Sequence, residues 1–144
     1  MDMQEIYDSV CLHLIKQGKP ALGPVPMYIN ASNNTSICMY RTPDGCKCAF
    51  GHLIPDDLYD PKMENKQAVQ VIEEWPKVGI ALDIYFDLNQ KPSDKLLLVT
   101  MLQRVHDHST TGAGLKQRLI VLGERLNLNT DVVKDAVFPE IWRS

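Results

Sequence analysis

The sequence predicts a single α+β domain over residues 1–144 that is mainly helical, with about five helices and one β-hairpin. Three observations lead to this fold class. The chain has 144 residues, of which 44% are hydrophobic and 23% charged, as in a folded domain with its own core. Several segments repeat apolar residues every three or four positions, as amphipathic helices do. One turn sequence, Pro43-Asp44-Gly45, separates two runs that suit β-strands.

The expected helices are identified by their caps and apolar stripes. Asp2 can cap the first helix, Glu5 three residues later completes a capping box, and Gly18 ends the apolar stripe. Cys11 lies on this stripe and is expected to fill the core. Further helices are expected over residues 65–75, 94–107, 115–126 and 131–137, of which 94–107 is apolar nearly all round and should be central.

The hairpin is expected to pair residues 37–42 with residues 46–53 across the turn. If Thr42 pairs with Cys46, alternate side chains of both arms share one face. Residues 78–88 are apolar at every even position, which predicts a third strand with its other face exposed, although a helix remains an alternative there.

Composition bears on where the protein acts and on its partners. No apolar run approaches the ~20 residues that a membrane helix needs, and the acidic start lacks the features of a signal peptide, so we expect a cytoplasmic protein. The net charge is −3, and residues 56–94 hold nine acids against four lysines. Because nucleic-acid binding relies on Lys and Arg, this balance argues against it. A basic protein could bind the acidic segment, but a solvated surface is the preferred explanation.

A cluster of potential metal ligands lies around the predicted hairpin. Three thiolates and one imidazole suit tetrahedral zinc. The usual pair of cysteines two residues apart is absent, and a domain of this size needs no metal to fold. Absence of a cofactor is therefore the leading expectation, with reduced thiols in its place and zinc as the alternative. The candidate ligands are Cys38, Cys46, Cys48 and His52.

Two further patterns could carry function. In His106-Asp107-His108, a carboxylate beside a histidine suits a catalytic dyad, but neighbouring residues on a helix point in different directions, so we expect helix capping instead. A nucleophile pair of Cys48 with His106 would indicate a small hydrolase or transferase. Residues 122–137 have the shape of a helix-turn-helix, but the acids of the second helix suit DNA phosphates poorly, and a plain helical hairpin is preferred.

The segment CMYRTPDGCKCAFGHLIPDDLY (38–59) and the later LQRVHD (102–107) resemble a pattern in small uncharacterised proteins of phages and prophages. That pattern has a Cys-x-Tyr-Arg start, a Gly-x-Lys-Cys-Ala-x-Gly turn, a Leu-Ile-Pro-Asp run and a later Leu-Gln-x-x-His-Asp. The match covers about a quarter of the chain, and Cys46 lies outside the pattern. The resemblance implies an accessory protein of a mobile element, with a shared site at Arg41, Cys48, Gly51, Asp56, His106 and Asp107.

The function that we predict is therefore binding rather than catalysis. A phage-type accessory protein would bind a host protein and modulate or inhibit it, and its target could belong to host defence or transcription. The alternatives are a helix-turn-helix nucleic-acid binder and a Cys/His-dependent hydrolase or transferase. The predicted contact residues are Tyr40, Arg41, Lys47, Phe50, Asp56, Asp57, His106 and Asp107.

Overall fold

The computed structural model describes residues 1–24, 37–84 and 93–143. It confirms a mainly helical α+β fold, with one short two-stranded antiparallel sheet in the described part. The helices are α1 (Met3–Gln17), α2 (Ala49–Leu53), α3 (Ala68–Glu74), α4 (Pro76–Leu82), α5 (Asp94–His108), α6 (Gly112–Arg125) and α7 (Asp131–Lys134), with a 3-10 turn η1 (Pro61–Met63). The strands are β1 (Leu22–Gly23) and β2 (Ile37–Cys38).

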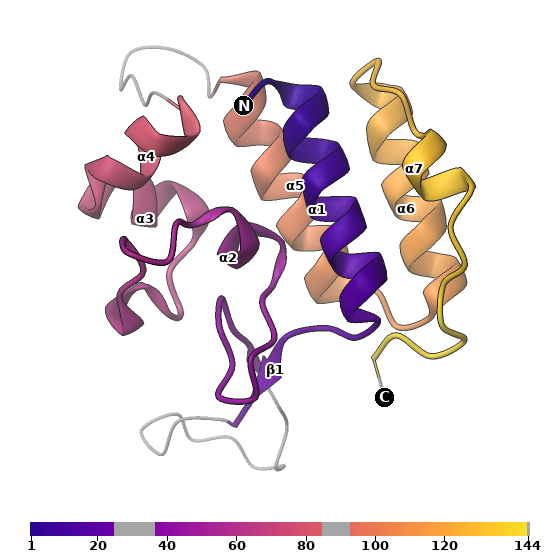
Figure 1. The fold of residues 1–144 in the computed structure, drawn as a ribbon, viewed down its shortest axis with the longest axis horizontal. Coiled ribbons are helices and arrows are strands. Elements are labelled where there is room, and N and C mark those ends of the chain that lie inside the picture. Colours follow the sequence, from indigo (N-terminus) through magenta and orange to yellow (C-terminus); the bar gives the residue numbers. More distant parts are fainter. Residues whose placement is uncertain (25–36, 85–92, 144) are drawn as a thin grey trace.

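The centre of the fold is α5, which packs against α1, α2, α3 and α6. Figure 1 shows α1 alongside α5, with α6 and α7 on one side of this pair and α3 and α4 on the other. The predicted capping box is present, because Asp2 accepts from Glu5 N and Glu5 accepts from Asp2 N. Gly18 ends α1 with a left-handed φ of 71°, a conformation that glycine adopts without steric cost.

The turn at residues 43–45 forms with the predicted register, but its two arms are not the predicted strands. Thr42 N donates to Cys46 O at 2.9 Å, and Arg41 forms an isolated bridge with Lys47. The first arm, β2, pairs instead with β1, with Leu22 opposite Cys38.

The second predicted strand, residues 46–53, is wrong over its last five residues, which form helix α2. Cys48 caps this helix, because its Sγ accepts from Gly51 N at 3.3 Å. Gly51 lies directly against the carbonyl oxygen of Tyr40, where any Cβ would overlap that oxygen. The close approach of helix and turn therefore requires glycine here.

The prediction of a third strand over residues 78–88 is also wrong in its described part, because residues 76–82 form α4. Pro76 occupies the first turn of that helix, where its missing N–H costs nothing. Val78 and Leu82 are one helical turn apart and both buried, whereas Ile80 between them is 67% exposed. Residues 85–88 of the predicted strand lie outside the described residues.

The C-terminal helix pair has the plain hairpin arrangement that we preferred. α7 is a single turn of four residues, too short to lie along a DNA groove as a recognition helix. Gly123 serves packing, because a Cβ there would lie 2.8 Å from the hydroxyl of Tyr7 on α1. None of the described helices is long and apolar enough to cross a membrane.

Candidate functional site

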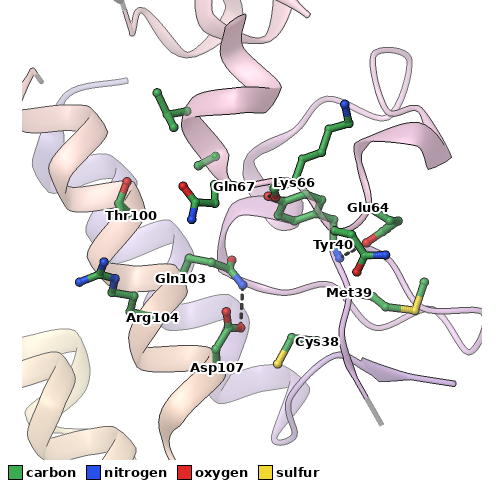
Figure 2. A pocket seen from close by; sticks show the side chains of 13 residues that line it. Cys38, Met39, Tyr40, Glu64, Lys66, Gln67, Thr100, Gln103, Arg104 and Asp107 are labelled. Atoms are coloured by element: carbon green, nitrogen blue, oxygen red, sulfur yellow. Dashed lines mark hydrogen bonds between the residues drawn. The ribbon is translucent and has the colours of Figure 1, made fainter. Parts of the chain in front are cut away.

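A cavity of about 320 Å³ opens between β2, the segment after η1 and the side of α5. Figure 2 shows Cys38 and Asp107 at one end of this cavity, with Gln103 bonded to Asp107. Polar residue types outnumber apolar ones in its lining, which consists of Cys38, Met39, Tyr40, Glu64, Asn65, Lys66, Gln67, Ala68, Val69, Thr100, Gln103, Arg104 and Asp107.

The thiol of Cys38 and the carboxylate of Asp107 line this end of the cavity, and the imidazole of His106, which is fully buried behind them and does not line the cavity, lies close to both. One ligand atom each of Cys38, His106 and Asp107 lies within 4.8 Å of the others. Cys38 ends β2, and the other two residues belong to the last turn of α5. The cluster therefore depends on the docking of β2 against the end of α5. We name it the Cys38–His106–Asp107 cluster.

Hydrogen bonds fix the tautomer of the buried His106 ring. Ala21 N–H donates to His106 Nε2 at 3.0 Å, so this nitrogen must be the unprotonated acceptor. The Nδ1–H then donates to Asp107 Oδ1 at 2.8 Å. The expectation that neighbouring helical residues cannot bond each other is wrong here, because Nδ1 is the ring nitrogen nearest the backbone and a short Asp side chain reaches it.

The chain itself covers the imidazole from the other side. Trp142 is 3% exposed, stands edge-on to the His106 ring and donates its Nε1–H to the His106 carbonyl at 3.2 Å. Arg143 donates to the Asp107 carbonyl at 2.9 Å. His106 is thus held by the residue before β1, by α5 and by the C-terminal segment together, which gives it a structural role.

The environment of Cys38 keeps its thiol protonated. Burial, together with the charge of Asp107, raises the pKa of Cys38 to about 12, against a smaller lowering by Arg143. Arg143 Nη1 lies 3.8 Å from the sulfur. Because the thiolate is the nucleophilic form, Cys38 is a poor nucleophile at neutral pH.

The cluster offers three potential ligands for a metal ion, but its hydrogen bonds fit a metal poorly. Zinc bound at His106 Nδ1 would move the ring proton to Nε2. That proton would then face the N–H of Ala21 at the 3.0 Å contact, so two donors would oppose each other in a buried site. The positive charge of Arg143 beside the sulfur also opposes a cation.

The structure does not bring the four predicted zinc ligands together. Among the described residues, the one group of three or more potential ligands contains Cys38 but not Cys46, Cys48 or His52. Cys48 is fully buried as the α2 cap, and burial raises the pKa of its thiol. His52 Nε2 instead bonds Ser9 Oγ at 2.9 Å, and no hydrogen bond of the described residues joins Cys48 to His106.

The two aromatic residues of the predicted contact surface at the hairpin are buried. Tyr40 is 6% exposed and Phe50 is fully buried, so the expectation that they face a partner is wrong. Their rings pack edge to face in the core. The two bulky residues were assigned to an exposed strand face, but α2 replaces that strand and turns Phe50 inward.

The charged residues of the predicted surface pair with each other. Arg41 binds Asp56 at 2.8 Å and donates to Ile54 O at 2.7 Å, and Lys47 lies 3.3 Å from the same carboxylate. The hydrogen bond from Lys47 lowers the pKa of Asp56, with a further contribution from Arg41. Asp56 and its neighbour Asp57 stay exposed to solvent.

Two polar residues that hold the site together were missed in the sequence. Gln103 accepts from Phe50 N at 2.9 Å and donates to Asp107 at 2.8 Å, so it joins α2 to the cluster. Glu64 accepts from the backbone of Tyr40 at 2.8 Å and from the Tyr59 hydroxyl at 2.6 Å. Of the two, only Gln103 could have been identified from the sequence, because it lies four residues before Asp107 on one helix face.

Comparisons with protein-family models, with curated proteins and with solved structures found no match to this chain.

Proposed function

We propose that this chain is a small phage-type accessory protein that binds a host protein and modulates or inhibits it without catalysing a reaction. The proposal rests on how the reactive side chains of the candidate site are bonded and protonated. In the Cys38–His106–Asp107 cluster the imidazole and the carboxylate bond each other, Ala21 N–H occupies the second ring nitrogen, and the thiol stays protonated, so the cluster holds no activated nucleophile. The resemblance to phage and prophage proteins supports an origin in a mobile element.

The alternatives have weaker support. A hydrolase or transferase using Cys48 would need a thiolate, but this thiol is buried and caps α2. A nucleic-acid binder using the C-terminal helices would need a recognition helix, and α7 has only four residues. A protein partner in the host cytoplasm, in a defence or transcription complex, therefore stays the leading proposal.

The test is capture of a partner from a bacterial host lysate on the immobilised chain. We expect one host protein in stoichiometric amount, retained at moderate salt and absent from beads that carry an unrelated acidic protein. A Cys38→Ala variant with native circular dichroism should capture the same amount, because the thiol takes no part in chemistry. Absence of any stoichiometric partner contradicts the proposal. If the unchanged chain abolishes a host activity and the Cys38→Ala variant does not, the result would favour an enzyme.

A further inference from the structure

A second recess lies between α5 and α6, and it shares Arg104 with the lining of the first cavity but contains no residue of the Cys38–His106–Asp107 cluster. It has a volume of about 340 Å³ and a mainly apolar floor. Its floor consists of Met101 and Val105 from α5 and Val121 and Leu122 from α6. The recess lies between α5 and α6, two helices of 15 and 14 residues that pack against each other. We name it the α5/α6 groove.

The rim of the α5/α6 groove is positively charged although the whole chain is acidic. Arg104, Arg118 and Arg125 line it, and its lining contains no Asp or Glu. All three side chains are exposed. In the described part of the chain, no ion pair joins any of them to a carboxylate, and Arg118 has only a 3.5 Å contact with Ser109 Oγ.

The spacing of these charges selects the kind of ligand. Arg118 and Arg125 are seven residues apart on α6, which is about 10.5 Å along the helix axis at 1.5 Å per residue. One small anion cannot neutralise both. A helix with acidic side chains two turns apart has the same repeat, and apolar side chains between them would meet Val121 and Leu122.

From the apolar floor and the unpaired arginines we infer that the α5/α6 groove binds an acidic amphipathic helix of a partner protein. This inference rests on the proposed binding function and assigns it a surface. The partner helix completes a three-helix contact, with its apolar stripe on Val105, Val121 and Leu122 and its carboxylates on the rim. The neutralised arginines give the contact its charge specificity, because a basic or neutral helix would leave them unpaired.

The experiment uses the intact chain and a display library of helical peptides of about 14 residues, long enough to span the groove. We expect the selected peptides to combine acidic residues with an apolar stripe. An Arg118→Glu/Arg125→Glu variant should bind them about tenfold more weakly or worse, because attraction becomes repulsion at two rim positions. The affinity of an Arg118→Gln/Arg125→Gln variant for the peptides should lie between those of the unchanged chain and the glutamate variant. Binding of the peptides to the unchanged chain should weaken as the salt concentration rises.

The matched control is Lys62→Glu/Lys77→Glu, which makes the same change in net charge at two exposed positions outside the groove. This variant should keep its affinity, and circular dichroism should show both variants folded. The inference is overturned if no peptide is enriched, if the selected peptides are neutral or basic, or if the groove variant binds them unchanged. Self-association of the unchanged chain that the groove variant abolishes would also overturn it, because the occupant would then be a second copy.

Capture from host lysate separates this inference from the proposed function. If the unchanged chain and the Arg118→Glu/Arg125→Glu variant capture the same partner equally, the binding function stands and the groove is not its surface. If the unchanged chain captures nothing, the proposed function fails, and the peptide selection still decides whether the groove binds acidic helices.

Discussion

Acidification from pH 7 to pH 5 should destabilise the protein through a stacked histidine pair between α1 and α2. The rings of His13 and His52 are parallel, with centroids 4.2 Å apart. Burial lowers the pKa of His52 from 6.5 to about 4, with smaller contributions from the charges of His13 and Lys47. Burial also lowers the pKa of His13. The unfolded chain therefore binds more protons than the native protein below pH 6.5, so stability falls as the pH drops toward 4.

The size of the effect follows from the two pKa values of His52. For a fully shielded ring, the loss between pH 7 and pH 5 is about 1.8 kcal/mol. Because the ring is partly exposed, solvent screening reduces this to about 1 kcal/mol. Acidic side chains titrate over the same range, so the contribution of His52 must be isolated by comparison with a variant that cannot titrate there.

The assay is urea unfolding of the native chain and of His52→Gln at both pH values. Glutamine can keep a hydrogen bond to Ser9 but carries no proton-linked charge. We expect the native chain to lose about 1 kcal/mol more than the variant between pH 7 and pH 5. An equal loss in both proteins would refute this account of the histidine pair.

Three further experiments test separate parts of the structure. Tyr7→Phe removes a buried hydroxyl that donates to Leu119 O at 2.7 Å, and it should lower the free energy of unfolding, measured in urea, by about 1–2 kcal/mol. Unchanged stability would contradict that hydrogen bond. Gly112→Ala places a Cβ into the Pro139 carbonyl and should cost more than about 2 kcal/mol, whereas Gly114→Ala, with its nearest contact at 3.0 Å, should change stability by less than about 1 kcal/mol. Zinc titration by calorimetry should show no stoichiometric site tighter than about 1 µM, and one equivalent bound and lost in Cys38→Ala would reverse our assessment of the cluster.

Elements with strong local signals were predicted well from the sequence. α1 has its capping box and terminal glycine, and α5 has the Ser93 cap and an apolar stripe, so their bounds agree closely with expectation. α2 was missed because its cap is a cysteine sulfur, a weak acceptor that capping rules do not favour. α4 was read as a strand because Val78 and Leu82 satisfy both an alternating and a helical spacing.

The site was harder to predict because tertiary contacts assemble it. Cys38 reaches His106 because β2 pairs with β1, and Ala21, whose N–H bonds the ring, directly precedes β1. The sequence placed Cys38 with its near neighbours Cys46 and Cys48 instead, where a hairpin would have aligned the sulfurs. The positive charge of the α5/α6 groove was equally hard to predict, because Arg104 and Arg125 come from two helices whose packing the sequence does not specify.

The most direct test of a structural rather than catalytic cluster is the titration of the Cys38 thiol. Its alkylation rate can be followed against pH on the folded protein, with site-resolved mass spectrometry separating it from the other cysteines. The structure predicts a thiol that stays protonated through neutral pH, with a pKa of about 12. A Cys38 pKa below about 8 would reveal an activated thiolate and contradict the account.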